Sequence, residues 1–243
     1  MFILFAPSED KREGGNCEFL PSSLLFGLEK SRDEMLNSYR MLIDTQNPVQ
    51  LQELFGIKDS DKYQRFLKPL DTASCLQAIE RYSGVAYEYL NYLALPEDAQ
   101  EYLAKKVIIF SNLFGPIRAS DTIPDYKFKQ GSSVGHIAPE VFYKKHFSGL
   151  LDEMIGENEV LDLRAGFYDK FYIPKDTSTT LKFLKEGKVV SHWAKAYRGL
   201  VLRECAIHQI KSTEMLEKHV FSGLEMIDKI HTSRKKELIF SIL

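Results

Sequence analysis

Basic side chains that could bind phosphate or carboxylate groups occur at separate places along the chain. Lys195 and Arg198 are three residues apart, so they can project from one helix face or from a strand-to-helix junction, and Gly199 permits close approach of another segment. Arg118 lies in a loop-rich stretch, and Lys11 lies close to the N-terminus. Arg binds such anions through a bidentate fork, whereas Lys acts as a point charge. We predict that these four cations line one anion-binding cleft.

Asp121 and Tyr126 are the candidates for acid–base chemistry in such a cleft. Both lie in the stretch 115–139, where Gly and Pro are frequent, and long loops of a compact domain are often functional. The cleft could then belong to an enzyme that acts on a phosphorylated or nucleotide-like small molecule. A second interpretation stays open, in which Asp121 only forms a structural ion pair with Arg118.

The cysteine and histidine patterns give no support to metal chemistry or to a nucleophile. The three cysteines form no CxxC pair, and the six histidines form no HxxxH or HxH pair, so we predict no metal site and no cofactor. The sequence also lacks a G-x-S-x-G elbow, a Walker A motif and a G-x-G-x-x-G fingerprint. Without an E-x-x-H motif or a Cys or His cluster, a dedicated iron store is disfavoured.

Residues 51–58, which read L-Q-E-L-F-G-I-K, resemble the helix-hairpin-helix motif, L-x-x-L-P-G-I-G. In that motif a tight turn between two helices exposes backbone N–H groups, which bind a DNA phosphate without reading the base sequence. Gly56 can supply the positive φ of the turn. Lys58, Lys62 and Arg65 could add phosphate contacts.

Two residues depart from the motif. Phe55 replaces the usual Pro, and Lys58 replaces the second Gly, where a bare backbone normally approaches the phosphate. A packing corner between two helices, with no ligand, would have a similar sequence. The element is expected at about 47–70, and DNA binding and simple packing both remain possible functions for it.

The candidate site residues must be positioned by the strands and helices of the fold. These elements follow one another without a regular βαβ alternation. The expected strands are 2–6, 107–110, 160–163, 188–193 and 237–242, and the expected longer helices are 27–44, 141–155 and 197–210. The mixture indicates an α/β (mixed α+β) fold. We predict a single compact domain over residues 1–243, with a central mixed sheet, surrounding helices and the embedded helix-hairpin-helix-like element.

The composition is that of an ordinary globular protein, with 243 residues, 44% hydrophobic, and a net charge of −2. A polycation that grips nucleic acid over its whole surface is therefore excluded. Charge is uneven, however, because residues 182–211 hold seven cations and two acids. No apolar run approaches the roughly 18 residues of a membrane span, and no signal peptide is recognised, so we expect a cytoplasmic protein without a membrane partner.

Six segments, in order along the chain, resemble the YaaA family of bacterial peroxide-stress proteins. The similarity runs from residue 1 to about 210, and its most extensive part is S-N-L-F-G-P-I-R-A-S-D at 111–121, which is similar to the family's S-G-L-Y-G-x-L-R-P-x-D. The other segments are A-P-S-E-D-K at 6–11, R-Y-S-G-V-A-Y at 81–87, Y-K-F-K-Q-G at 126–131, L-R-A-G-F-Y at 163–168 and K-A-Y-R-G at 195–199.

The resemblance implies a cytosolic protein that limits damage by hydrogen peroxide, in connection with low free iron. It implies a single-domain α/β fold with a positively charged cleft and a helix-hairpin-helix element at 51–66, and binding of double-stranded or branched DNA. No settled reaction comes with the family. Its charged cleft positions map onto Lys11, Arg118, Asp121, Tyr126, Lys195 and Arg198.

The sequence therefore predicts two alternative functions. The first is a stress protein that binds duplex or branched DNA through backbone phosphates, independently of sequence. The alternative is an enzyme acting on a small anionic molecule in the basic cleft.

Overall fold

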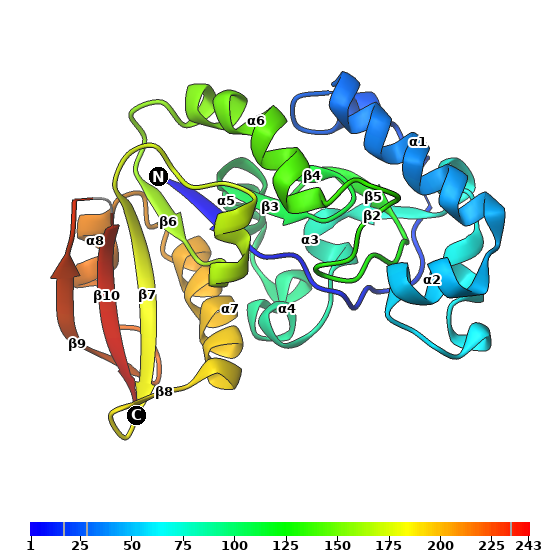
Figure 1. Ribbon diagram of the computed structural model, residues 1–243. Coiled ribbons are helices and arrows are strands. Elements are labelled where there is room, and N and C mark those ends of the chain that lie inside the picture. The colour runs from blue at the N-terminus through cyan, green and yellow to red at the C-terminus, as the bar shows by residue number, and fades with distance from the viewer. Residues whose placement is uncertain (17, 28, 234) are drawn as a thin grey trace.

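A mixed β-sheet runs through the centre of the molecule (Figure 1). The computed structural model describes residues 1–16, 18–27, 29–233 and 235–243, so Cys17 and Leu28, which entered the sequence patterns, lie outside the described residues. The strands of this sheet are β1 (Phe2–Phe5), β3 (Val107–Ser111), β4 (Gly115–Arg118), β6 (Val160–Asp162), β7 (Ser178–Lys185), β8 (Lys188–Val189), β9 (Leu224–His231) and β10 (Lys235–Ile242).

The strand order in the described residues is β4-β3-β1-β6-β7-β10-β9, with β8 paired to β7. Strands β3, β1, β6, β7 and β10 run parallel, whereas β4 and β9 are antiparallel to their neighbours. A second, two-stranded sheet pairs β2 (Cys75–Gln77) with β5 (Thr122–Pro124). The predicted α/β class with a central mixed sheet is confirmed.

Helices cover both faces of the sheet. They are α1 (Lys30–Thr45), α2 (Pro48–Phe55), α3 (Ala78–Arg81), α4 (Val85–Leu90), α5 (Glu97–Lys106), α6 (Pro139–Ile155), α7 (Ser191–Ile207) and α8 (Thr213–Lys218). Figure 1 shows α6 in front of the sheet, with α5 and α7 behind it. Helix α7 packs on β7, α5 and α4, and α6 packs on β4. Because of this cover, the central strands β1 and β3 are apolar runs buried on both faces.

The two central strands β1 and β6 mark a switch point in the topology. They are parallel neighbours, but the chain leaves β1 toward β3 on one side and leaves β6 toward β7 on the other. The connecting segments therefore diverge beyond the carboxyl ends of these strands, where Ala6 and Leu163 follow them. Open α/β sheets bind ligands in the crevice that such a divergence creates.

Two regions differ from the sequence-based expectation. Residues 188–193 do not form one strand, because β8 ends at Val189 and α7 begins at Ser191. The helix expected from Tyr197 thus starts six residues earlier and includes Lys195 in its first turns. The strand at 178–185 was not predicted, because its pattern is mixed rather than cleanly alternating, yet it pairs with β6 and β10.

Candidate functional site

A cavity of about 470 Å³ opens at the switch point beyond β1 and β6. Residues 5–10 line it from the end of β1, residues 163–168 contribute from the end of β6, and 84–88 contribute from the start of α4. Lys195 and Arg198 of α7 complete the wall. With Gln130, five parts of the chain that are far apart in the sequence therefore meet around one space.

Gly199 brings α7 close enough to reach this cavity. A Cβ placed on Gly199 would lie only 1.9 Å from the carbonyl oxygen of Ala86, so only glycine allows α7 to pack this tightly on α4. At the other end of this contact, the hydroxyl of Tyr87 donates a hydrogen bond of 2.8 Å to the carbonyl of Ala6. Helix α4 therefore links α7, which carries both cations, to the loop after β1.

Arg198 is a half-buried cation that faces the cavity. Burial lowers the pKa of its guanidinium, and the nearby Asp162 carboxylate opposes that shift. Within the described part of the chain, Arg198 forms no hydrogen bond or ion pair. A partly desolvated guanidinium without a partner favours an anionic ligand, which would supply charge-assisted hydrogen bonds. Lys195 lies on the same helix face and is exposed.

Three acidic residues also line the cavity. Glu9, Asp10 and Glu88 line it together with the two cations. The carboxylate of Glu9 accepts a hydrogen bond of 3.1 Å from the backbone N–H of Gln130 and lies 3.5 Å from the ammonium of Lys127. The cavity lining therefore offers both hydrogen-bond acceptors and cationic donors. These acids are not among the site residues predicted from the sequence, although their place directly after the first strand is a signal that could have identified them.

Lys11 lies behind the cavity wall. Its ammonium donates hydrogen bonds to the carbonyl oxygens of Ser8 (3.2 Å) and Glu9 (3.3 Å), and it stands 4.1 Å from the ring centre of Tyr126. Burial, with a smaller contribution from the neighbouring Lys127, lowers the pKa of Lys11 to about 7. Lys11 thus supports the loop that forms the cavity wall, and it is absent from the described residues that line the space.

Tyr126 belongs to a buried hydroxyl network beneath the same loop. Its hydroxyl lies 2.8 Å from the hydroxyl of Tyr82 and 2.8 Å from that of Ser111, which ends β3. Burial, together with Tyr82, raises the pKa of Tyr126 well above its usual value. The phenol therefore keeps its proton at neutral pH, and the structure places it behind the cavity rather than in it.

Arg118 and Asp121 lie together, away from the cavity. The buried carboxylate of Asp121 accepts hydrogen bonds from the backbone N–H groups of Leu25 (2.7 Å) and Arg118 (2.9 Å), and burial raises its pKa. The guanidinium of Arg118, at the end of edge strand β4, lies 3.9 Å from Asp121. Neither residue is among the described residues that line the cavity. The geometry thus brings together two of the four predicted cations.

The predicted helix-hairpin-helix-like element forms only its first half. Asn47 caps α2 by accepting hydrogen bonds from two backbone N–H groups, and Gly56 ends the helix with φ of 69°. The second arm is not an α-helix, because the chain continues through two short 3₁₀ turns, Ser60–Lys62 and Gln64–Leu67. The predicted second helix at this position is therefore wrong.

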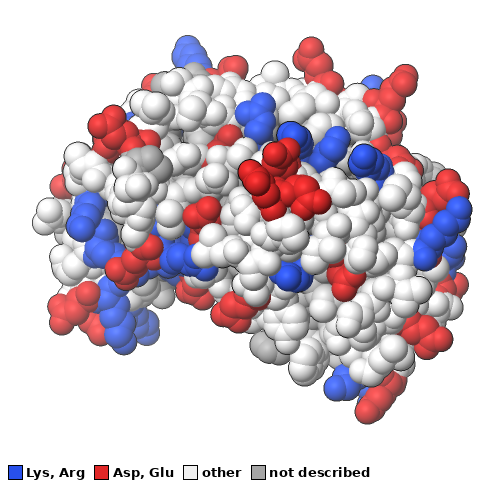
Figure 2. Space-filling model, turned by 180° about the vertical axis from the view of Figure 1, so that it is seen from behind, with Lys and Arg blue, Asp and Glu red and all other residues white. Residues whose placement is uncertain are grey.

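The basic residues of this element differ in whether they form ion pairs within the molecule. Lys58 is exposed, and Lys62 lies 3.5 Å from Asp59. Arg65 is paired with Glu13 and with Asp125, the latter at 3.3 Å, so its charge is used within the molecule. The far face of the molecule shows Lys and Arg side chains interleaved with Asp and Glu rather than one continuous basic surface (Figure 2).

Comparison with known proteins gives a family match over most of the chain. Residues 1–229 match the family model described as peroxide stress protein YaaA, which extends the resemblance beyond residue 210. An uncharacterized protein of Campylobacter jejuni is 47% identical over 100% of both chains. A UPF0246 protein of Corynebacterium glutamicum is 33% identical over 86% of each chain. Among the described helices, none has the length and apolar character needed to cross a membrane.

Proposed function

Because this chain belongs to the YaaA family of peroxide stress proteins, we propose that it acts in cytoplasmic resistance to hydrogen peroxide by binding a small phosphorylated or nucleotide-like molecule in the cavity beyond β1 and β6. The observation that carries this proposal is the half-buried, unpartnered guanidinium of Arg198 among the described residues of the cavity wall. The cavity volume of about 470 Å³ lies within the range of small-molecule sites.

The mixed charge of the cavity lining limits the chemical class of the ligand. A phosphate or similar anion fits Arg198 and Lys195, while Glu9, Asp10 and Glu88 suit hydroxyl or amino groups that donate hydrogen bonds. A nucleotide carries both kinds of group, whereas inorganic phosphate carries only the first. If the bound molecule is also converted, these three carboxylates are better placed for acid–base work than Asp121 or Tyr126, because they line the space.

The test is a calorimetric screen of nucleotides and sugar phosphates against the full chain. We expect Arg198→Gln to weaken binding of any hit by roughly 10- to 100-fold, the loss of one or two charge-assisted hydrogen bonds. Arg118→Gln is the matched control, because this Arg is half-exposed and lies outside the cavity. Equal losses in both variants, or no hit with the native chain, would reject the proposal.

A second candidate is sequence-independent binding of duplex or branched DNA, with protection from damage linked to free iron as its consequence. The formation of α2 with its Gly56 turn, and the exposed Lys58 beside it, favours this function. Contacts to phosphates would make the affinity fall steeply with salt.

The DNA candidate is tested with duplex and junction oligonucleotides at low and moderate salt. We expect Gly56→Asp to weaken binding at least tenfold, because a carboxylate at the turn repels phosphate and its Cβ would displace the side chain of Lys129, 2.7 Å away. Gly131→Asp is the control, since this glycine also has a positive φ and has open space around it. A native chain that binds no DNA at low salt would leave the small-molecule cavity as the remaining candidate.

A further inference from the structure

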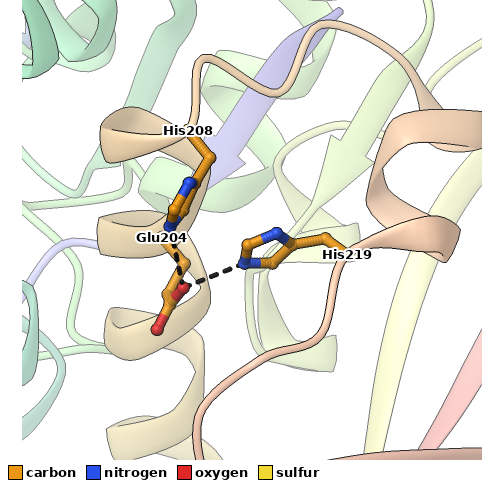
Figure 3. A group of neighbouring side chains, drawn as sticks. All are labelled: Glu204, His208 and His219. Atoms are coloured by element: carbon orange, nitrogen blue, oxygen red, sulfur yellow. Dashed lines mark hydrogen bonds and ion pairs between the residues drawn. The ribbon is translucent and has the colours of Figure 1, made fainter.

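A carboxylate and two imidazoles gather where the C-terminal end of α7 meets the segment after α8 (Figure 3). Glu204 and His208 are four residues apart, so they share one face of the helix. His219 follows α8 and points toward them from the other side. Sequence spacing gave no histidine pair here, because the second imidazole is brought in by the fold.

The donor atoms lie close enough together to ligate one ion after small side-chain rotations. Oε2 of Glu204 lies 2.9 Å from Nε2 of His219 and 3.5 Å from Nε2 of His208, and the three ligand atoms lie within 4.8 Å of one another. With metal–ligand bonds of about 2.0–2.1 Å, neighbouring ligands are roughly 2.9 Å apart in octahedral and roughly 3.3 Å apart in tetrahedral geometry. Small rotations of the most exposed side chain, His208, would therefore complete the arrangement.

The backbone holds two of the three donors in place. Glu204 lies inside α7, and the backbone N–H of His219 donates a hydrogen bond of 3.1 Å to Met215 at the end of α8. The ring of His219 also contacts Phe221, with ring centres 4.6 Å apart. His208 is 52% exposed, so an ion could enter from solvent and keep water on its outer side.

The cluster has no competing cation within the described chain. The ion-pair contacts of Glu204 are those with the two histidines, whereas the nearby Lys218 is paired with Glu214. Two neutral imidazoles and one carboxylate are donors that suit a first-row divalent ion such as Zn²⁺, and they suit Mg²⁺ or Ca²⁺ poorly. We propose that Glu204, His208 and His219 form a binding site for a divalent transition-metal ion with open positions for water.

The cluster of Glu204, His208 and His219 is separate from the cavity beyond β1 and β6. Glu204 lies six residues beyond Arg198, or about 9 Å further along the helix axis. The bound ion would join the end of α7 to the segment that leads into β9. Substitutions in the cluster can therefore be made without changing a residue of the cavity wall.

The experiment is a titration of the chelator-treated full chain with Zn²⁺, followed by calorimetry and thermal unfolding. We expect one ion per chain and a rise of the melting temperature by about 5–10 °C when free Zn²⁺ is about 100 times Kd. Co²⁺ is the spectroscopic probe, because its visible absorption bands report nitrogen and oxygen ligands.

Substitutions decide whether these residues are the ligands. The His208→Gln variant changes an exposed side chain, so it should fold normally and bind Zn²⁺ at least tenfold more weakly. The double variant Glu204→Gln, His208→Gln should not bind Zn²⁺ at this site. His136→Gln is the control, since it removes an exposed histidine far from the cluster in the sequence and should leave binding unchanged. The proposal is overturned if the native chain takes up no Zn²⁺ below millimolar concentration, or if the double variant binds as tightly as the native chain.

Discussion

At the scale of single residues, Lys11 was predicted to bind an anion, but in the structure it holds the loop in front of it in place. Its ammonium is enclosed by the rings of Tyr82 and Tyr126 and by the carbonyl oxygens of the loop in front of it. Desolvation there lowers its pKa from 10.5 to about 7. The sequence shows a lysine in a loop after a strand, but it does not show that aromatic residues from two distant segments close over it.

The lowered pKa of Lys11 predicts a pH-dependent stability. Between about pH 7 and 10.5 the unfolded chain binds more protons at this residue than the folded chain, so stability rises with pH through this window. Replacing Lys11 with Met removes that dependence. We expect the two free energies of unfolding to diverge by up to about 1.4 kcal/mol per pH unit in favour of the native chain. Urea unfolding at pH 6 to 9.5 measures this, and parallel curves would contradict it.

Asp121 allows the two interpretations of its role to be separated. Asp121→Ala leaves the N–H groups of Leu25 and Arg118 without their acceptor, so we expect a loss of about 2–4 kcal/mol in the free energy of unfolding. Asp71→Ala is the control, because this exposed carboxylate pairs with Arg40 at the surface and should cost less than about 1 kcal/mol. Unchanged stability together with lost conversion of a ligand would instead favour the catalytic role.

At the scale of elements, the position of α7 decides the site. The helix carries Lys195 and Arg198 at its start, and its contact with α4 through Gly199 sets them in the cavity wall. The three-residue spacing of the two cations allowed either a shared helix face or a strand-to-helix junction, and the structure has the helix face. The start of the helix was not predictable, because residues 188–193 have the β-branched and aromatic composition of a strand. Tertiary contacts outweigh that local preference.

The close contact at Gly199 can be tested with one methyl group. Gly199→Ala should gain about 1 kcal/mol in helix propensity, but its Cβ would overlap the carbonyl of Ala86 and push α7 away. We expect a net loss of about 1–3 kcal/mol and weaker ligand binding in the cavity. Gly149→Ala in α6 is the matched control, since its added methyl meets nothing within 4 Å and should stabilise the chain. Urea unfolding of both variants gives the comparison.

At the scale of the whole molecule, the sequence predicted the centre better than the edges. Strands β1 and β3 were recognisable because a strand buried on both faces is a continuous apolar run. Strand β9 was missed, since it is mostly exposed and its composition is mixed. The cavity was predicted only in part, because which loops meet beyond β1 and β6 depends on strand order, and a sequence pattern does not give strand order.

The strand order predicts which backbone segments a bound ligand would protect from hydrogen exchange. If a small anion binds at the switch point, amide hydrogen exchange should slow in 5–10, 84–88 and 195–198 together, although more than 180 residues separate the first from the last. Exchange in the exposed edge strand β9 should stay unchanged, which provides the internal control. Mass spectrometry of peptides from the free and ligand-saturated chain measures the effect. Protection confined to 51–66 would move the binding site to the Gly56 turn, and protection in only one of the three segments would exclude a ligand enclosed by this cavity.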